Sequence, residues 1–157
     1  MITRRSLLAA GTLAGLGLLQ AARAEPLPLV TVNKDPNCGC CGAWADHLRA
    51  AGFPVKTVET QSLRAVKHRL GVPAELSSCH TAEVAGYVIE GHVPAPEIAR
   101  LLREKPAGKG LAVPEMPIGS PGMEVEGSEN ETYDVLLFGD GEPTVFARYK
   151  GSAPVQR

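Results

Sequence analysis

Apolar and polar positions along residues 27–105 follow two different periods. Short runs rich in β-branched residues, in which every second position is apolar, predict strands; the first reads LPLVTVNK. Runs with apolar residues three and four positions apart predict helices, and Gly52 and Gly71 end two of them. The predicted strands cover residues 27–34, 53–59, 77–83 and 87–90. The predicted helices cover residues 43–51, 62–70 and 95–105.

This β-α-β-α-β-β-α order is typical of an α/β domain of the thioredoxin-like kind. The next segment, residues 106–130, is rich in Pro and Gly and predicts a long loop. Residues 133–138 and 144–150 then predict a C-terminal β-hairpin that turns at Gly139-Asp140-Gly141. No internal repeat or linker divides residues 25–157, so we expect this range to form a single thioredoxin-like domain.

The first 24 residues have the pattern of a cleaved signal peptide. The pair Arg4-Arg5 precedes an uncharged run over residues 7–19, and Ala22-Arg23-Ala24 is a small-residue cleavage pattern. The uncharged run is shorter than the roughly 20 apolar residues of a spanning helix, so we expect no stable membrane insertion after cleavage. The arginine pair favours twin-arginine export, although no aromatic residue follows it. We therefore expect a periplasmic protein.

Composition narrows the range of functions. Hydrophobic residues make up 44% of the chain and charged residues 21%, which is typical of a protein with a packed core. Aromatic residues reach only 4%, and the net charge is −1 without a basic run, so a nucleic-acid partner is not expected. Four Cys and four His are unusual in 157 residues. In an oxidising compartment, thiols without a function tend to become disulfides.

Three of the cysteines form the strongest chemical motif, Cys38-Gly39-Cys40-Cys41, between the first strand and the first helix. A helix N-terminus favours an anionic sulfur, so these thiols suit either a redox pair or a metal site. A redox pair, Cys38 and Cys41, needs only two sulfurs. The additional Cys40 and the distant Cys79 favour a soft metal, because thiolates can bridge several Cu(I) ions. Two structural disulfides, Cys38–Cys41 and Cys40–Cys79, are the alternative.

The pair Cys79-His80 lies at the start of the third predicted strand. In a thioredoxin-like fold, the loop that enters this strand faces the cysteine motif, so Cys79 would direct a fourth sulfur at the cluster. His80 would then be a metal ligand, a hydrogen-bonding partner of a ligand, or a surface residue. The sequence does not separate these three roles.

Other metal-binding candidates are weaker. Met116 and Met123 flank a Pro- and Gly-rich stretch, and thioethers suit Cu(I), although Met more often fills gaps in a core. We expect residues 114–124 to fold back over the cysteine turn. His92 follows the fourth predicted strand, where a packing or capping role is favoured over a ligand role.

The remaining polar candidates are expected to be solvated. His47 and His68 lie beside charged residues on predicted helices. Residues 126–131 are acidic and predict a hydrated loop rather than a metal site.

Three stretches of the chain resemble the CopG-like family of exported copper-resistance proteins, formerly a family of unknown function. They are CGCCGAWADHL at 38–48, SSCHTAEVAGYVIEGHVP at 77–94 and GLAVPEMPIGSPGMEVEG at 110–127. The resemblance implies a thioredoxin-like fold, a cysteine-bridged site for several copper ions, and interconversion of Cu(I) and Cu(II). By position, it implies that Cys38, Cys40, Cys41 and Cys79 supply the sulfurs.

Three functions remain open from the sequence. The first is copper binding with copper oxidoreduction, which would need an electron donor. The second is a thiol-disulfide oxidoreductase in which Cys38 and Cys41 cycle without metal. The third is a non-catalytic chaperone that passes Cu(I) to a copper efflux or copper oxidase protein.

Overall fold

A computed structural model describes residues 26–156 of the chain. The predicted signal peptide, residues 1–24, lies outside the described residues. Within them, no helix combines the length and the apolar character that crossing a bilayer requires.

The helices and strands mix α and β structure along the whole described chain. The helices are α1 (Gly39–Ala50), α2 (Leu63–Leu70) and α3 (Ala95–Glu104), with one short 3-10 turn at Ala74–Leu76. The strands are β1 (Val30–Lys34), β2 (Val55–Glu59), β3 (His80–Val84), β4 (Tyr87–Glu90), β5 (Gly110–Ala112), β6 (Thr132–Phe138), β7 (Thr144–Lys150) and β8 (Ala153–Pro154).

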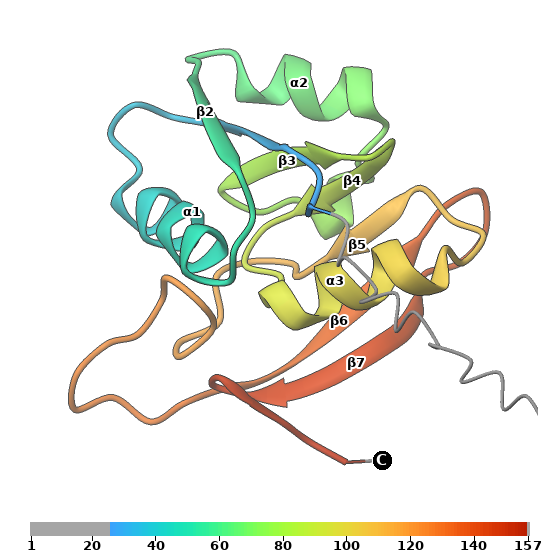
Figure 1. Ribbon diagram of the computed structural model, residues 1–157. Coiled ribbons are helices and arrows are strands. Elements are labelled where there is room, and N and C mark those ends of the chain that lie inside the picture. Colours follow the sequence, from blue (N-terminus) through green and yellow to red (C-terminus); the bar gives the residue numbers. More distant parts are fainter. Residues whose placement is uncertain (1–25, 157) are drawn as a thin grey trace, which may run out of the picture.

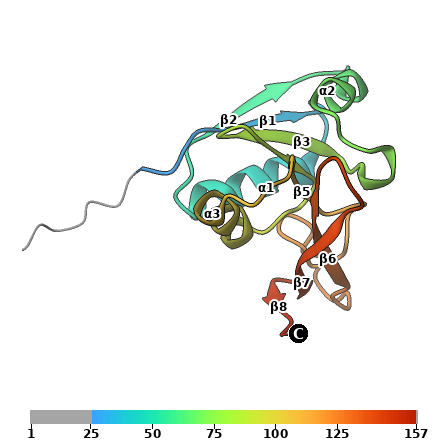
Figure 2. The same ribbon diagram turned by 90° about the vertical axis from the view of Figure 1, so that its right-hand side faces the viewer.

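All eight strands join one sheet in the order β2-β1-β3-β4-β5-β6-β7-β8 (Figures 1 and 2). The pairs β1–β2 and β4–β5 are parallel, and the other neighbours are antiparallel. The antiparallel register of β1 and β3 sets Lys34 opposite His80. The end of β1 and the start of β3 therefore lie at the same edge of the sheet.

Helices cover both faces of the first four strands, with α1 and α3 on one face and α2 on the other (Figure 2). Because successive side chains of a strand point to opposite faces of the sheet, the core is divided into two clusters, one on each face. Ile89 and Leu111 pack with Trp44 of α1 and Leu101 of α3. Val88 and Ala112, their sequence neighbours, belong to a smaller cluster that includes Leu70 of α2, together with Leu76, Phe138, Val72 and Leu136.

The C-terminal hairpin extends the sheet past α3. Its two strands, β6 and β7, pair across a register shift between Val135 and Leu136. The Tyr149 hydroxyl donates a hydrogen bond to a Glu97 carboxylate oxygen on α3, 2.8 Å away. The Arg100 guanidinium, also on α3, lies 3.7 Å from the centre of the Phe146 ring. The hairpin predicted from the sequence is therefore present and is packed against α3.

The predicted start of the first helix was wrong, and one strand was not predicted. The first helix begins at Gly39 rather than residue 43, because its buried face continues toward the N-terminus: Cys41, Trp44, Ala45 and Leu48 are buried at helical spacing. The predicted loop 106–130 contains β5, which was missed because three residues carry no readable period. This strand forms because β4 and β6 offer backbone hydrogen bonds on both of its sides.

Gly110 in β5 has no room for a side chain. A Cβ at this position would lie 1.7 Å from the Val88 carbonyl oxygen, whereas a Cβ at Gly141 would meet no atom within 4 Å. We expect Gly110→Ala to lower the free energy of unfolding by about 1–3 kcal/mol or more, because the neighbouring backbone must move. Gly141→Ala, the control, should change it by less than about 0.5 kcal/mol. Chemical denaturation measures both; equal stabilities would contradict the close packing of β5 on β4.

Candidate metal centre

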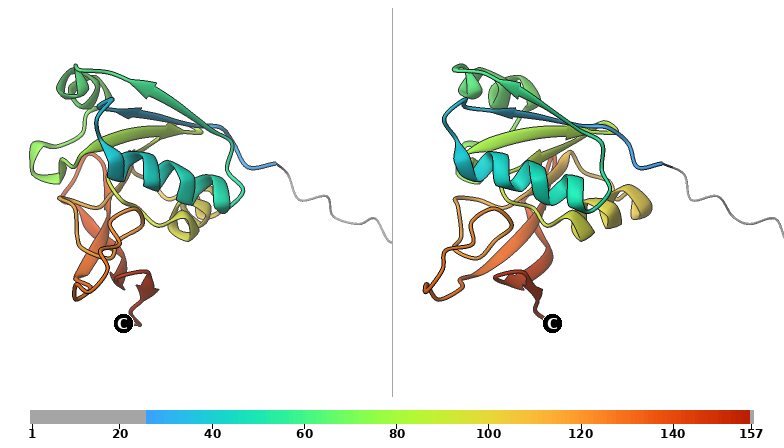
Figure 3. Two further views of the ribbon diagram at one scale, coloured as in Figure 1. Left: turned by 90° about the vertical axis from the view of Figure 1, so that its left-hand side faces the viewer. Right: turned by 60° about the vertical axis from the view of Figure 1, so that its left-hand side comes forward.

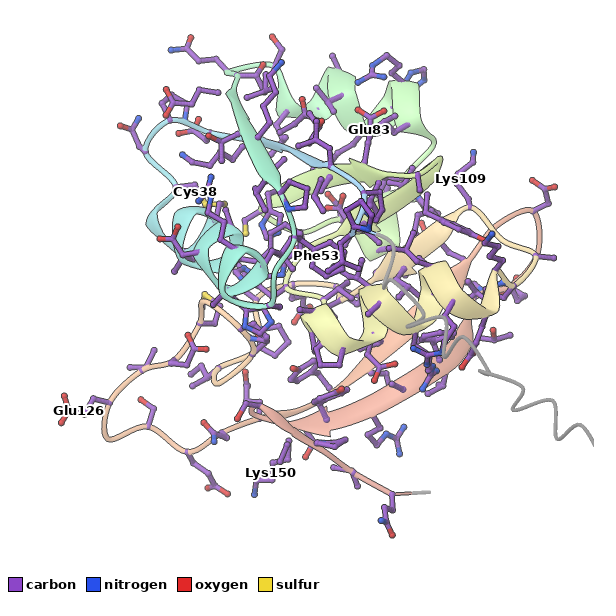
Figure 4. The ribbon with its side chains drawn as sticks, in the orientation of Figure 1. Cys38, Phe53, Glu83, Lys109, Glu126 and Lys150 are labelled. Atoms are coloured by element: carbon purple, nitrogen blue, oxygen red, sulfur yellow. A yellow bond between two sulfur atoms is a disulfide. The ribbon has the colours of Figure 1, made fainter. Side chains whose placement is uncertain are left out.

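The four cysteines meet at the edge of the sheet where β1 ends and β3 begins. Cys38 is the N-cap residue of α1, and Cys40 and Cys41 lie in its first turn. Cys79 immediately precedes β3. Figure 4 labels Cys38 at the start of α1, with sulfur atoms gathered beside it. The pairing of β1 with β3 thus brings together cysteines that are far apart in the sequence.

The sulfur atoms form a compact group. A disulfide joins Cys38 to Cys41, while Cys40 and Cys79 are free thiols. The Cys40 Sγ lies 3.5 Å from that of Cys38 and 3.8 Å from that of Cys79. The Cys79 Sγ is also 3.5 Å from that of Cys41. All four lie within 4.8 Å of one another. Of the two disulfides considered from the sequence, Cys38–Cys41 is present and Cys40–Cys79 is not.

The helix position favours negatively charged sulfur. No side chain caps the N-terminus of α1, and no acidic residue occupies its first turn. The exposed amide groups and the positive end of the helix dipole therefore act on the Cys38–Cys41 turn without competition. Cys41 is fully buried, whereas Cys38 and Cys40 are half-buried.

A buried acidic residue fixes the backbone next to Cys79. Glu90 is fully buried at the end of β4. Its Oε1 accepts a hydrogen bond of 2.6 Å from the Ser78 backbone N–H and is paired with the Lys67 ammonium group. Its Oε2 accepts a 2.7 Å hydrogen bond from the Thr81 hydroxyl. These contacts on either side of Cys79 restrict the movement of its sulfur.

Two imidazole rings lie beside Cys79. The Cys79 Sγ lies 3.1 Å from His92 Nε2 and 3.3 Å from His80 Nδ1. Both rings are fully buried, and the His80 ring packs at 4.3 Å from the Trp44 ring. Of the three roles considered for His80, a surface position was wrong. One ring nitrogen from each histidine lies within 4.8 Å of the Cys79 sulfur and of the other nitrogen.

Burial sets the protonation of these groups. Burial, and then the nearby Cys40, raise the pKa of the Cys79 thiol to about 12. Burial lowers the pKa of His92 and lowers that of His80 well below its usual range. At neutral pH the histidines are therefore uncharged, which is the form that binds metal ions. The thiol keeps its proton until a metal ion displaces it.

The loop over residues 114–124 lies against the start of α1, as expected from the sequence (Figure 3). At Gly122, φ is +85°, and a Cβ there would lie 2.7 Å from the Trp44 backbone nitrogen and 2.8 Å from the Cys40 carbonyl oxygen. The neighbouring Pro121 carbonyl oxygen lies 2.8 Å from His92 Nδ1. The loop is therefore in direct contact both with the cysteine turn of α1 and with His92.

The two methionines of this loop differ in exposure. Met116 is 47% exposed and lines a shallow pocket of about 310 Å³ with residues of β6. Met123 is half-buried, one residue from Gly122. Glu126 lies at the outer end of the same loop (Figure 4), and residues 126–131 are exposed, consistent with the hydrated acidic loop expected.

The position of one histidine differs from the sequence prediction, and one buried carboxylate was not predicted. His47, expected to be solvated, is half-buried, and its Nε2 accepts a 3.1 Å hydrogen bond from the Ala95 backbone N–H. His92, for which a packing or capping role was favoured over a ligand role, is buried and lies beside Cys79, a position compatible with either role. Glu90 carried no signal except that it is a charged residue at the end of an apolar strand. His68 is exposed, as expected.

The donor atoms of this site suit soft and borderline metals. Four sulfurs can hold or bridge Cu(I) or bind Zn²⁺, and a mixed set of thiolate and imidazole suits copper or zinc. The same sulfurs can also undergo thiol–disulfide exchange, because the free thiols of Cys40 and Cys79 each lie 3.5 Å from a sulfur of the Cys38–Cys41 disulfide. Geometry alone leaves both metal binding and thiol chemistry available.

Comparison with known proteins relates the chain to copper-resistance proteins. A family described as "Protein of unknown function, DUF411" matches residues 76–123. Two solved structures titled "Copper resistance protein copG", forms 1 and 2, superpose with a TM-score of 0.74 each. They are 44% and 46% identical to this chain, and the matches cover 80% of it and 99% of each neighbour. No curated protein matches.

Glu90 offers a test of how the site is held. We expect Glu90→Gln to lower the free energy of unfolding by about 3 kcal/mol, because half-buried Lys67 loses its charged partner. The Cys79 thiol should also react faster with a thiol reagent, since the Ser78 backbone is less restrained. Glu83→Gln is the control: it breaks an exposed pair with Arg69 and should cost less than about 1 kcal/mol. Equal effects of the two changes would contradict the anchoring role.

Proposed function

Because this chain belongs to the CopG family of copper-resistance proteins, we propose that it binds Cu(I) through its cysteine cluster and serves copper homeostasis. One observation supports this most strongly: four sulfur atoms lie within 4.8 Å of one another at a helix N-terminus. Thiolates are the preferred ligands of Cu(I), and the helix end stabilises their negative charge. In this proposal copper is the cargo or substrate of the protein.

We propose that the reduced site holds more than one copper ion. A single Cu(I) needs two or three sulfur ligands, whereas Cys38, Cys40, Cys41 and Cys79 offer four that can bridge. Reduction of the Cys38–Cys41 disulfide would make all four available at once. Cys38, Cys40 and Cys79 are half-buried and Cys41 is fully buried, so an ion would enter from the side of the first three.

The same site supports a redox role. Oxidation of the Cys38 and Cys41 thiols to a disulfide releases two electrons and two protons. Two Cu(II) ions take up those electrons and become two Cu(I) ions, and the protons go to solvent. In the reverse direction, two Cu(I) ions give two electrons to the disulfide, which takes up two protons from solvent and returns to the dithiol. Repeated reduction of Cu(II) would instead need an external electron donor to restore the dithiol. Cys38 and Cys41 would be the catalytic residues.

A thiol-disulfide oxidoreductase is the second candidate. The Cys38–Cys41 disulfide at the start of a helix favours it, since such a position lowers thiol pKa values and promotes exchange. The extra thiols, Cys40 and Cys79, favour the copper function instead. Activity without metal distinguishes the two.

The proposal also covers the fold family and the cellular location of the protein. We propose that residues 30–104 form a thioredoxin-like unit, supported by the β1-α1-β2-α2-β3-β4-α3 order and by the β2-β1-β3-β4 arrangement with β3 antiparallel to β1. We also propose export to the periplasm through the signal pattern of residues 1–24, where copper efflux or copper oxidase proteins would be partners.

A Cu(I) titration tests the copper function. We expect the fully reduced protein to bind more than one Cu(I) per chain in competition with a chromogenic chelator. Cys41→Ser should abolish the binding of more than one Cu(I) per chain, and any redox activity, together. Cys79→Ser should reduce copper loading yet still allow the Cys38–Cys41 disulfide to form. Saturation of the wild type at one equivalent, or full loading of Cys79→Ser, would overturn the multinuclear proposal.

The methionines are tested separately. If Met116 and Met123 supply ligands, the double change to Leu should weaken Cu(I) affinity while leaving thermal stability nearly unchanged, because bulk is kept and only the thioethers are lost. Single changes separate the two positions: exposed Met116 should matter less than half-buried Met123. An unchanged titration in the double variant would leave a site built from Cys alone or from Cys and His.

A further inference from the structure

The Cys38–Cys41 disulfide uses two of the four cysteine sulfurs of the site. Cys40 and Cys79 remain free thiols, with their sulfurs 3.8 Å apart. That distance is close to the separation of two sulfurs that share one metal ion, because each Zn–S or Cu–S bond is about 2.3 Å long. A pair of ligands therefore persists when the other two sulfurs are oxidised.

Nitrogen donors complete this pair. The Cys79 Sγ lies 3.1 Å from His92 Nε2, and one nitrogen of His80 is also within 4.8 Å of both. Neither nitrogen belongs to the four-sulfur group, yet both histidines are fully buried beside it. Cys79 is therefore shared by two groups of donors, one made of sulfur and one made of sulfur and nitrogen.

The hydrogen bond at the far side of His92 determines which nitrogen can bind a metal. His92 Nδ1 lies 2.8 Å from the Pro121 carbonyl oxygen. A carbonyl oxygen only accepts, so Nδ1 carries the proton and donates it. Nε2 of the neutral ring then presents its lone pair to the Cys79 side. This is the arrangement in which metal-binding histidines are usually held, with the second nitrogen donating to a backbone carbonyl.

The His80 ring has an unsatisfied polar atom. Among the described residues, His80 Nε2 is buried without a hydrogen-bond partner. A buried polar nitrogen without a partner destabilises the fold, so its presence calls for a reason other than stability. The ring is held between Trp44 at 4.3 Å and His92 at 5.0 Å, and its Nδ1 lies 3.3 Å from the Cys79 Sγ.

We propose that the disulfide form of the protein retains a single-copper site, made by Cys79, His80 and His92, whose donor atoms lie within 4.8 Å of one another, with the free Cys40 thiol beside Cys79. This inference rests on the proposed copper function and adds a second mode of binding to it. The four-thiol form would hold several Cu(I) ions on sulfur, whereas the disulfide form holds one copper ion on sulfur and nitrogen. A set of one thiolate and two imidazoles is the donor type of copper sites that work in both oxidation states.

The consequence is that the redox state of Cys38 and Cys41 sets both copper capacity and ligand type. When the dithiol gives two electrons to two Cu(II) ions, it loses its own sulfur ligands and the ions they held become available for transfer. One ion stays bound at the shared Cys79. Electron transfer and partial copper release are therefore one event in this site.

Two proteins test the proposal. One is the wild type with the disulfide closed, verified by mass spectrometry after alkylation of two free thiols. The other is Cys38→Ser/Cys41→Ser, which lacks the same two sulfurs permanently. We expect both to bind one Cu(I) per chain in chelator competition, while the fully reduced wild type binds more. X-ray absorption should show sulfur together with nitrogen ligands in the disulfide form and mainly sulfur in the reduced form.

His92→Gln in the Cys38→Ser/Cys41→Ser background should weaken the remaining site by about 10- to 100-fold or more, since loss of even a partner of a ligand has that effect. His68→Gln, at an exposed position on α2, is the matched control and should leave affinity unchanged. Circular dichroism confirms that the variants are folded.

The outcomes separate this inference from the function it rests on. No copper on the folded disulfide form, a sulfur-only shell in that form, or equal affinities for the His92 and His68 variants would overturn the second site. If the reduced wild type still bound several ions, the copper function would stand without it. Failure of the reduced wild type to bind copper would overturn both.

Discussion

The antiparallel pairing of β1 with β3 is the constraint on which the site depends. With Lys34 opposite His80, the residue that follows β1 and the residue that precedes β3 must lie at one edge of the sheet. The first turn of α1 begins there, so its cysteines face Cys79 although the chain between them forms a helix, a strand and another helix. Backbone hydrogen bonds along two strands thus determine the spacing of four sulfur atoms.

The surroundings of this edge hold reactive groups in place by burying them. Glu90 holds the backbone beside Cys79, and Gly122 allows the 114–124 loop to reach the backbone of α1. Buried thiols and imidazoles are normally costly to charge, so the metal-free site keeps Cys79 protonated and both neighbouring histidines neutral. Metal ions change that balance, because they replace the proton on sulfur and supply the positive charge themselves.

The arrangement of donors links thiol chemistry with metal binding. Cys38 and Cys41 are close enough to form a disulfide, and both also belong to the group of sulfurs that can hold copper. In the proposed function, oxidation of this pair would remove two sulfur ligands from copper. The redox chemistry and the copper affinity would then depend on the same two sulfur atoms.

The sequence by itself determined the local structure and the chemistry that is written in short motifs. Periodicity identified the three helices and the paired strands of the core, and the cysteine motif with Cys79 pointed to copper and to the family. Tertiary structure decided the rest. His92 and Glu90 became part of the site through strand pairing and burial, and β5 became a strand because its neighbours offered hydrogen bonds on both sides. Such contacts join segments that are distant in the chain, and no local period or motif encodes them.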